Sequence, residues 1–202
     1  DQHLELIHSI GVKTVKIASS DINHIPLIVN AAKTGMCIQL DTGNATYDEI
    51  AYAITKVEEQ GNNNIIIHHC PTGYPAKLDS VQLAEIPKLK KLFPYPIAFS
   101  DHTPGWHMNI AAVCMGASMI EKTITQDKTT PSVEHMFSLE EEEAKTFITE
   151  IREVEKAIKD TERKLNPDPK KRFATRRSIF SKSQIEKGAK ITEAHIEYRR
   201  PG

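Results

Sequence analysis

The chain has 202 residues, enough for one hydrophobic core, and 39% of them are hydrophobic and 26% charged, as in ordinary globular proteins. Its formal net charge of −1 argues against nucleic acid as a partner, because binding a phosphate backbone requires clustered cations. The sequence has neither an apolar run of membrane-spanning length nor a basic-then-apolar leader, so we expect a cytoplasmic protein without membrane contact.

Five short apolar segments rich in β-branched residues alternate with helix-like stretches. Their spacing of about two to three dozen residues suits a strand followed by a crossover helix, and the alternation predicts an α/β fold with a parallel sheet. The expected strands are 14–18, 37–40, 64–67, 96–99 and 118–120.

Two of the helices have a predicted capping box. Thr46 with Glu49 starts one of them, and Ser138 with Glu141 starts the other. Each box precedes apolar residues at helical spacing, which we interpret as faces that pack on the core. These residues are Ile50, Ala53, Ile54 and Val57 in the first helix, and Phe147, Ile148, Ile151, Val154 and Ile158 in the second. Shorter helices are expected at 26–33 and 109–115 and end at Gly35 and Gly116.

The three cysteines, Cys37, Cys70 and Cys114, lie within or beside apolar runs. They are odd in number and lack the spacing of a metal finger, so we interpret them as buried, reduced thiols of a cytosolic protein.

Polar residues follow the ends of the predicted strands. The run Ser100–Thr103 brings a serine, a carboxylate and an imidazole to the end of strand 96–99, where they suit an anion, a metal or a proton. Similar groups occur at 16–21, 41–43, 69–70 and 121–123. Five strand–helix units do not close an eight-stranded barrel, and an open sheet is the competing interpretation. That open sheet would lack its usual nucleotide site, because no glycine-rich loop follows the first strand.

The pattern changes beyond Asp160 to charged, proline-containing sequence. The basic residues at 170–172 and 176–177 are interpreted as a solvated linker. Short apolar segments follow at 178–180 and 191–196, with a turn at 186–188 between them. About 25 residues bury too little surface to fold alone, so this part is either docked or the start of a second domain. The abrupt opening of the chain resembles the interior of a larger protein.

Several motifs, in this order along the chain, resemble the N-acetylneuraminate (sialic acid) synthase family. The resemblance implies a partial (β/α)8 TIM barrel, strands four to eight, over residues 1–160. It further implies a linker over 161–176 and the beginning of an antifreeze-like (SAF) domain over 177–202, with the first three barrel units absent. The matching motifs are Lys16–Ser19, Asp41–Gly43, His69–Pro75, Ser100–Thr103, Gly116–Ala117, Ile120–Lys122 and Arg200–Gly202.

The family joins phosphoenolpyruvate to the aldehyde of an N-acetylated amino sugar, releases phosphate and forms a nine-carbon 2-keto-3-deoxy acid. The resemblance therefore implies a transferase whose acceptor is N-acetylmannosamine or a 2,4-diacetamido hexose. It also implies a divalent metal, manganese or magnesium, that polarises the aldehyde. A synthase for a different acceptor, or a sugar- or anion-binding protein that has lost catalysis, are the alternatives.

Residue by residue, the resemblance assigns Lys16, Ser19 and Ser100 to the anionic groups of phosphoenolpyruvate, with Lys16 also catalytic. Thr72 and Tyr74 are assigned to substrate binding, Tyr74 through the amino sugar. A strand-end lysine exposed to solvent and a tyrosine packed in a turn are the alternative readings.

His102 matches the family's first metal-binding histidine and is expected to be catalytic, although a core histidine bonded to backbone is the alternative. Arg200 matches an arginine that reaches from the small domain of one subunit into the barrel of the other. The resemblance thus implies a homodimer.

Three positions depart from the family pattern. Asp41 replaces a serine of the substrate site, Thr123 replaces the second metal histidine, and Glu134 replaces an aspartate. Carboxylate and imidazole bind metals readily, so Asp41, Glu134 or His135 is the candidate to complete a site around His102, with Glu134 also counted as catalytic. An ionised Asp41 would repel phosphate.

Two further expectations concern histidines. Side chains alternate along a strand, so His68 and His69 cannot both face the barrel interior. His107, near a helix start, is interpreted as solvated or capping. Finally, the missing barrel units would leave two strand edges open, and we expect the 202-residue piece alone to be inactive.

Overall fold

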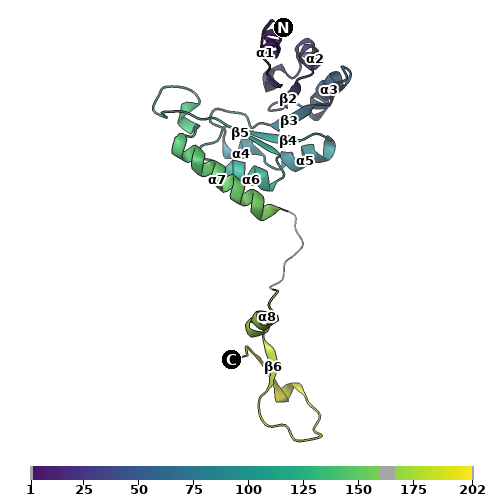
Figure 1. Ribbon diagram of the computed structural model, residues 1–202, viewed down its shortest axis with the longest axis vertical. Coiled ribbons are helices and arrows are strands. Elements are labelled where there is room, and N and C mark those ends of the chain that lie inside the picture. The colour runs from purple at the N-terminus through teal and green to yellow at the C-terminus, as the bar shows by residue number, and fades with distance from the viewer. Residues whose placement is uncertain (1, 160–166, 202) are drawn as a thin grey trace. The chain divides into compact units, whose positions relative to one another are not determined.

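The computed structural model describes residues 2–159 and 167–201, which belong to two units, residues 1–159 and residues 160–202 (Figure 1). In the first unit, five parallel strands pair in their order along the chain. They form a half-barrel and confirm the five predicted strands and the α/β class. The strands are β1 (Thr14–Ile17), β2 (Cys37–Asp41), β3 (Ile65–His69), β4 (Ile97–Asp101) and β5 (Met119–Lys122).

Helices connect consecutive strands, and one further helix precedes the first strand while another follows the last. Connections between parallel strands of one sheet are almost always right-handed, so helices that join neighbouring strands collect on one face of the sheet. They are α1 (Gln2–Ser9), α2 (Ile25–Lys33), α3 (Tyr47–Glu58), α4 (Leu78–Val81), α5 (Glu85–Leu92), α6 (His107–Cys114) and α7 (Glu141–Ile158), with 3-10 turns at Ser19–Asp21 and His135–Phe137. In Figure 1, α7 lies beside α6.

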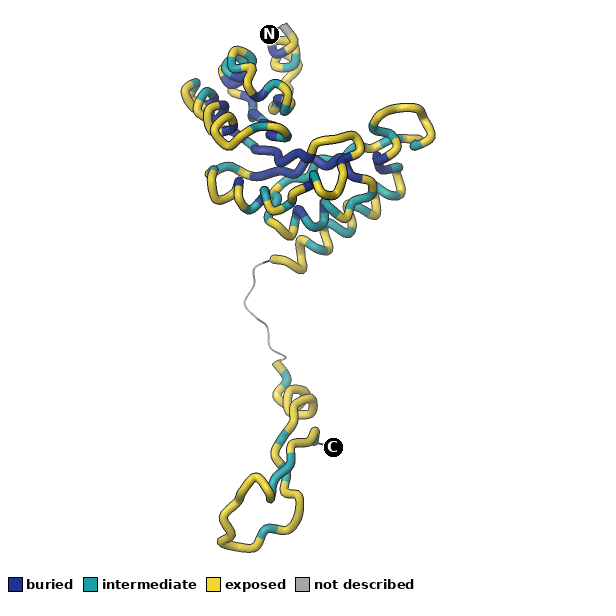
Figure 2. Tube along the Cα trace, turned by 180° about the vertical axis from the view of Figure 1, so that it is seen from behind, coloured by how far each residue is buried: buried dark blue, intermediate teal, exposed yellow. Residues whose placement is uncertain are grey.

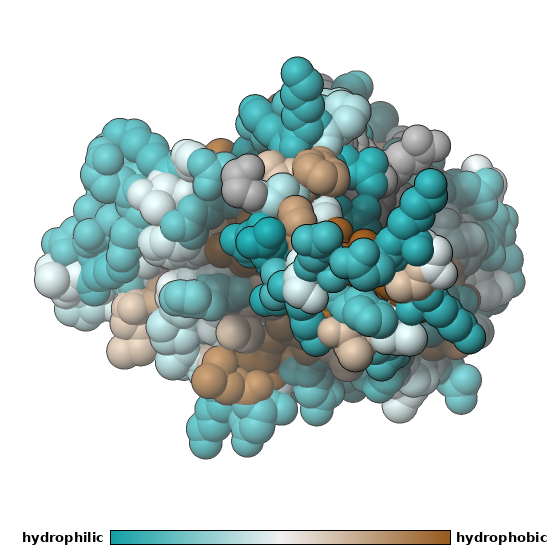
Figure 3. All heavy atoms as spheres, turned by 90° about the horizontal axis from the view of Figure 1, so that it is seen from below, coloured by the Kyte–Doolittle hydropathy of each residue, from teal (hydrophilic) through white to brown (hydrophobic). Residues whose placement is uncertain are grey.

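The core lies between the sheet and its helices. Alternate strand residues such as Ile38, Ile67 and Phe99 are fully buried against helical residues such as Ile28 and Ile50. Figure 2 shows the buried residues in dark blue along the strands, whereas the face in Figure 3 is mainly hydrophilic, with apolar side chains in small groups. The remaining strand residues point to the concave face, which is left free to carry polar chemistry.

Of the two predicted capping boxes, the first is confirmed and the second is formed by other residues than predicted. Thr46 caps α3 and forms the predicted reciprocal box with Glu49. Ser138 does not cap α7, because its hydroxyl donates to the carbonyl of Glu134 at 2.8 Å. The helix starts two residues later, and Glu140 forms the box with Glu143.

The expectation of a core-packing face on α7 is wrong for this unit. None of the residues of α7 is buried, and Ile148 and Ile158 are 57% and 47% exposed. The apolar face meets α6 and the ring of Trp106, which lies 6.5 Å from that of Phe147. The two outer strands, β1 and β5, each have one edge without a strand partner in the described sheet, as expected for five strands of a barrel.

The second unit contains α8 (Pro169–Thr175), β6 (Ser178–Ser181), a 3-10 turn (Glu193–His195) and β7 (Ile196–Arg199). β6 and β7 pair antiparallel. The predicted linker thus carries a helix, capped by the Asp168 carboxylate, which accepts from the backbone of Lys170 at 2.9 Å. No described residue of this unit is buried. The predicted boundary at residue 160 and the first part of the linker, 161–166, lie outside the described residues, and the SAF domain stays a prediction.

All three cysteines are free thiols, but burial was predicted correctly only for Cys70. Cys37 is half-buried, and Cys114, in the last turn of α6, is exposed. None of the described helices combines the length and the apolar character needed to cross a membrane.

Candidate active site

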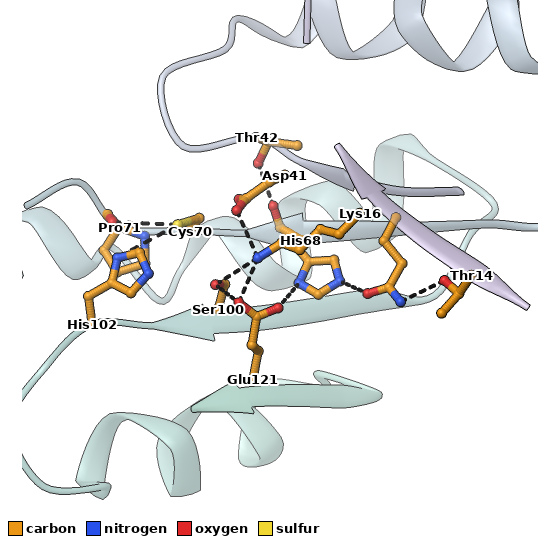
Figure 4. A network of polar contacts seen from close by, with 11 residues as sticks. Thr14, Lys16, Asp41, Thr42, His68, Cys70, Pro71, Ser100, His102 and Glu121 are labelled. Atoms are coloured by element: carbon orange, nitrogen blue, oxygen red, sulfur yellow. Dashed lines mark hydrogen bonds and ion pairs between the residues drawn. The ribbon is translucent and has the colours of Figure 1, made fainter. Parts of the chain in front are cut away.

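Four charged or polar side chains from four different strands meet on the concave face (Figure 4). Lys16 of β1 places its Nζ 2.6 Å from Glu121 Oε1 of β5, 3.1 Å from Asp41 Oδ2 of β2 and 3.3 Å from Ser100 Oγ of β4. The serine also donates to Glu121 Oε1 at 3.0 Å. The carboxyl ends of parallel strands gather at one edge, and ligands of open α/β sheets bind there. This cluster is the candidate site.

The electrostatics of the cluster keep its ion pairs charged. Burial opposes the charge on Lys16, but the hydrogen bond to Glu121 and the negative charge of Asp41 outweigh it and raise the lysine pKa. Burial likewise disfavours the charged form of Glu121, yet the hydrogen bond and charge of Lys16 lower its pKa. One ammonium thus faces two carboxylates, and Asp41 Oδ1 is buried without a hydrogen-bond partner. An incoming anion must therefore displace a carboxylate from Lys16.

His102 lies beside this cluster. The residue is 8% exposed, and its ring stacks on that of Tyr74 with centroids 4.4 Å apart and lies 6.2 Å from the ring of Phe137. His102 Nδ1 is 4.0 Å from Cys70 Sγ. Burial first, and then the charge of Asp41, raise the pKa of Cys70 to about 12, so this side chain is a neutral thiol. Cys70 thus lies between His102 and the Lys16 cluster, so the imidazole and the cluster belong to the same region of the site (Figure 4).

A buried ion pair fixes the backbone on both sides of His102. Asp101 Oδ2 lies 2.8 Å from Lys122 Nζ, and both side chains are almost completely buried. Asp101 Oδ1 accepts from the backbone and hydroxyl of Thr103, and Lys122 donates to the Thr103 carbonyl. The carbonyl of His102 itself accepts from Ala76 at 2.9 Å. The imidazole therefore sits on a turn that is clamped from two strands.

The predicted metal ligands do not gather into a coordination set. In residues 2–159 and 167–201, no three His, Cys, Asp or Glu side chains could hold a metal ion together. Asp41 is engaged in the lysine pair, and Glu134 is half-buried at the start of a 3-10 turn. His135 Nδ1 and Thr123 Oγ1 are buried without hydrogen-bond partners. These residues do not fit a metal site by themselves, and the divalent metal stays a prediction.

The other predicted substrate residues differ in their placement. Ser19 lies against Gly43, where an added Cβ would come within 3.2 Å of the serine hydroxyl. Thr72 is exposed, and Tyr74 is 56% exposed above His102, at the rim of the site. Arg200 belongs to the second unit and is exposed.

The sequence reasoning missed two residues and left a third without a role. Glu121 was quoted in a motif only, and His68 and Gln39 were not assigned to the site. His68 is fully buried, with Nε2 2.7 Å from Gln39 Oε1 and Nδ1 3.7 Å from Glu121 Oε2. His69 points to the other face, with Nε2 2.7 Å from the Val81 carbonyl, as strand alternation predicts. The same alternation separates His68 from His69, but only together with the register of β3 against its neighbours does it show which ring faces the cluster.

Comparison with known proteins identifies the relatives of this half-barrel. The model of the NeuB family matches residues 1–163. The chain belongs to the NeuB family. It is 36% identical to the N,N'-diacetyllegionaminic acid synthase of Campylobacter jejuni over 99% of this chain and 61% of that protein. It is 35% identical to the pseudaminic acid synthase of Helicobacter pylori, again over 99% of this chain and over 59% of the relative.

A solved NeuB-like structure has the same fold. The N-acetylneuraminic acid synthetase of Leptospira borgpetersenii, in complex with citrate, superimposes with a TM-score of 0.76 at 32% identity. The superposition covers 85% of this chain and 59% of that structure. The chain thus spans less than two thirds of the length of these NeuB-family relatives.

Proposed function

We propose that this chain supplies the phosphoenolpyruvate-binding part of a nonulosonic acid synthase. The reaction would condense phosphoenolpyruvate with an N-acetylated amino-sugar aldehyde and release phosphate. The observation that carries the proposal is the meeting of Lys16 and Ser100, 3.3 Å apart, at the carboxyl ends of the strands. An ammonium and a hydroxyl suit a carboxylate or phosphate, and both positions match the family motif quoted above.

In this proposal Lys16 binds and orients the anion. Its Nζ leaves Glu121 Oε1 and donates to an anionic oxygen, while Ser100 redirects its hydroxyl from the same carboxylate. Asp41 remains on the other side of the ammonium and limits how strongly the anion is held. Tyr74, exposed at the rim and stacked on the buried ring of His102, offers its aromatic face to the amino sugar.

The relatives support the class of product more than one particular acceptor. Synthases of legionaminic and of pseudaminic acid match with nearly equal identity. We therefore propose N-acetylmannosamine or a 2,4-diacetamido hexose as the acceptor. The homodimer in which Arg200 reaches the other subunit and the SAF character of the second unit belong to the same proposal.

The test measures phosphate release from phosphoenolpyruvate. The protein used carries residues 1–202 together with three further strand–helix units, because a closed barrel of this type has about eight. We expect release only when one of the candidate sugars is present, and no turnover by the 202-residue chain alone. Phosphoenolpyruvate binding without release for any sugar would favour the alternative, an anion-binding protein that has lost catalysis.

A further inference from the structure

His68 is a buried base that the proposed reaction has not used. It is fully buried on β3 and faces the concave side, next to the Lys16 cluster (Figure 4). One ring nitrogen contacts Gln39 of β2 and the other faces Glu121 of β5. Its Nδ1 has no hydrogen-bond partner.

A chain of hydrogen bonds fixes where the ring carries its proton. Thr14 Oγ1 donates to the carbonyl of Cys37 at 3.0 Å, so its oxygen accepts from Gln39 Nε2 at 2.8 Å. Gln39 Oε1 is then an acceptor, and His68 Nε2, 2.7 Å away, must donate to it. In the neutral ring, Nδ1 is therefore bare. It faces Glu121 Oε2 at 3.7 Å, so two acceptors oppose each other without a proton between them.

The charges around the ring set the pKa of His68 and so determine when Nδ1 becomes protonated. Lys16 from β1, Asp41 from β2 and Glu121 from β5 face His68, while β4 contributes the neutral Ser100. Burial, and next the positive charge of Lys16, lower the pKa of His68, so the unliganded ring is neutral. With the ring neutral, the two carboxylates and one ammonium sum to a negative site. An anion that binds Lys16 adds to this charge.

We propose that His68 takes up a proton at Nδ1 when an anion binds to Lys16. The proton comes from solvent, and the new N–H donates to Glu121 Oε2 as a charge-assisted bond. Glu121 then has a cationic partner of its own, which releases Lys16 from Glu121 to the anion. His68 Nε2 keeps its proton and donates it to Gln39 Oε1 both before and after the anion binds. The inference rests on the proposed function, because it takes the phosphoenolpyruvate anion as the ligand of Lys16.

The direction of the pH dependence follows from this exchange. Anion binding raises the pKa of His68 from its lowered value, so the complex binds one more proton than the free chain. Between these two pKa values, affinity falls as pH rises, by about tenfold per pH unit. Below the pKa of the free chain the proton is already bound and the dependence disappears.

The experiment is calorimetric titration of the chain with phosphoenolpyruvate in two buffers of different ionisation enthalpy. We expect an uptake of about one proton per anion near neutral pH. His68→Asn, whose amide permanently donates to Glu121, should bind without uptake, and His107→Asn, at the exposed start of α6, should behave as the original chain. If a variant does not fold, the proton uptake measured with the original chain is sufficient to test the proposal.

The outcomes separate the inference from the proposed function. Binding of phosphoenolpyruvate without proton uptake in the original chain overturns the role of His68 and leaves the proposed function standing. Absence of binding overturns both. A nitrogen-15 spectrum of the unliganded chain gives an independent check, because a His68 ring protonated on Nδ1 alone would contradict the hydrogen-bond chain from Thr14.

Discussion

Replacing Lys122 with methionine is expected to lower the free energy of unfolding by about 3–5 kcal/mol, because it leaves the carboxylate of Asp101 buried without its counter-charge. The pair is 2.8 Å long and both side chains are almost fully buried. Lys122 also donates to the carbonyl of Thr103, so the turn that carries His102 loses its second anchor. Urea unfolding of the original and substituted chains, followed by circular dichroism, measures the loss.

Two further variants make the measurement specific. Lys88→Met removes the same charge from α5, where the lysine is 58% exposed, and should leave the stability nearly unchanged. Adding Asp101→Asn to Lys122→Met removes both charges and should recover much of the loss. A Lys122→Met chain as stable as the Lys88→Met chain would show that the pair does not hold the turn.

Replacing Lys16 with methionine is expected to weaken phosphoenolpyruvate binding by about 10- to 100-fold, since a hydrogen bond to a charged group contributes about 1.5–3 kcal/mol. Asp41→Ser should act in the opposite direction. It removes one of the two carboxylates that compete with the ligand for the same ammonium, at 3.1 Å from Nζ. Calorimetric titration at one ionic strength compares the three chains.

Lys13→Met is the matched control for this change. Lys13 directly precedes β1, is exposed and carries the same charge, so its loss alters the net charge equally without touching the cluster. Its affinity should stay near that of the original chain. Equal weakening by both substitutions would mean that the general field of the protein, not the contact at Lys16, attracts the anion.

The strands were predictable from the sequence because each is a short run rich in β-branched residues, and these runs alternate along the chain with helical stretches. The polar residues at the strand ends were predictable for the same reason, since Lys16 lies near the carboxyl end of one such run and Ser100 follows another. His68 escaped because its neighbour His69 is equally polar, and only the register of β3 against β2 and β4 shows which ring faces the cluster. Local pattern cannot supply that register by itself.

The exposure of α7 and the separation of the candidate metal ligands have different physical causes. The apolar positions of α7 are spaced as for a buried helix face, but no residue of α7 is buried in the described unit, where the helix lies beside α6. For the metal site, residue types were sound ligands, whereas a coordination set also requires convergence in space. Asp41 converges on Lys16 instead, a partner 25 positions away that composition alone does not reveal.

The most direct test is a crystal structure of the chain with bound phosphoenolpyruvate. We predict an anionic oxygen of the ligand within hydrogen-bond distance of both Lys16 Nζ and Ser100 Oγ, with the lysine turned away from Glu121. Ligand density elsewhere, with the bond from Lys16 to Glu121 intact, would contradict the assignment of this cluster as the anion site.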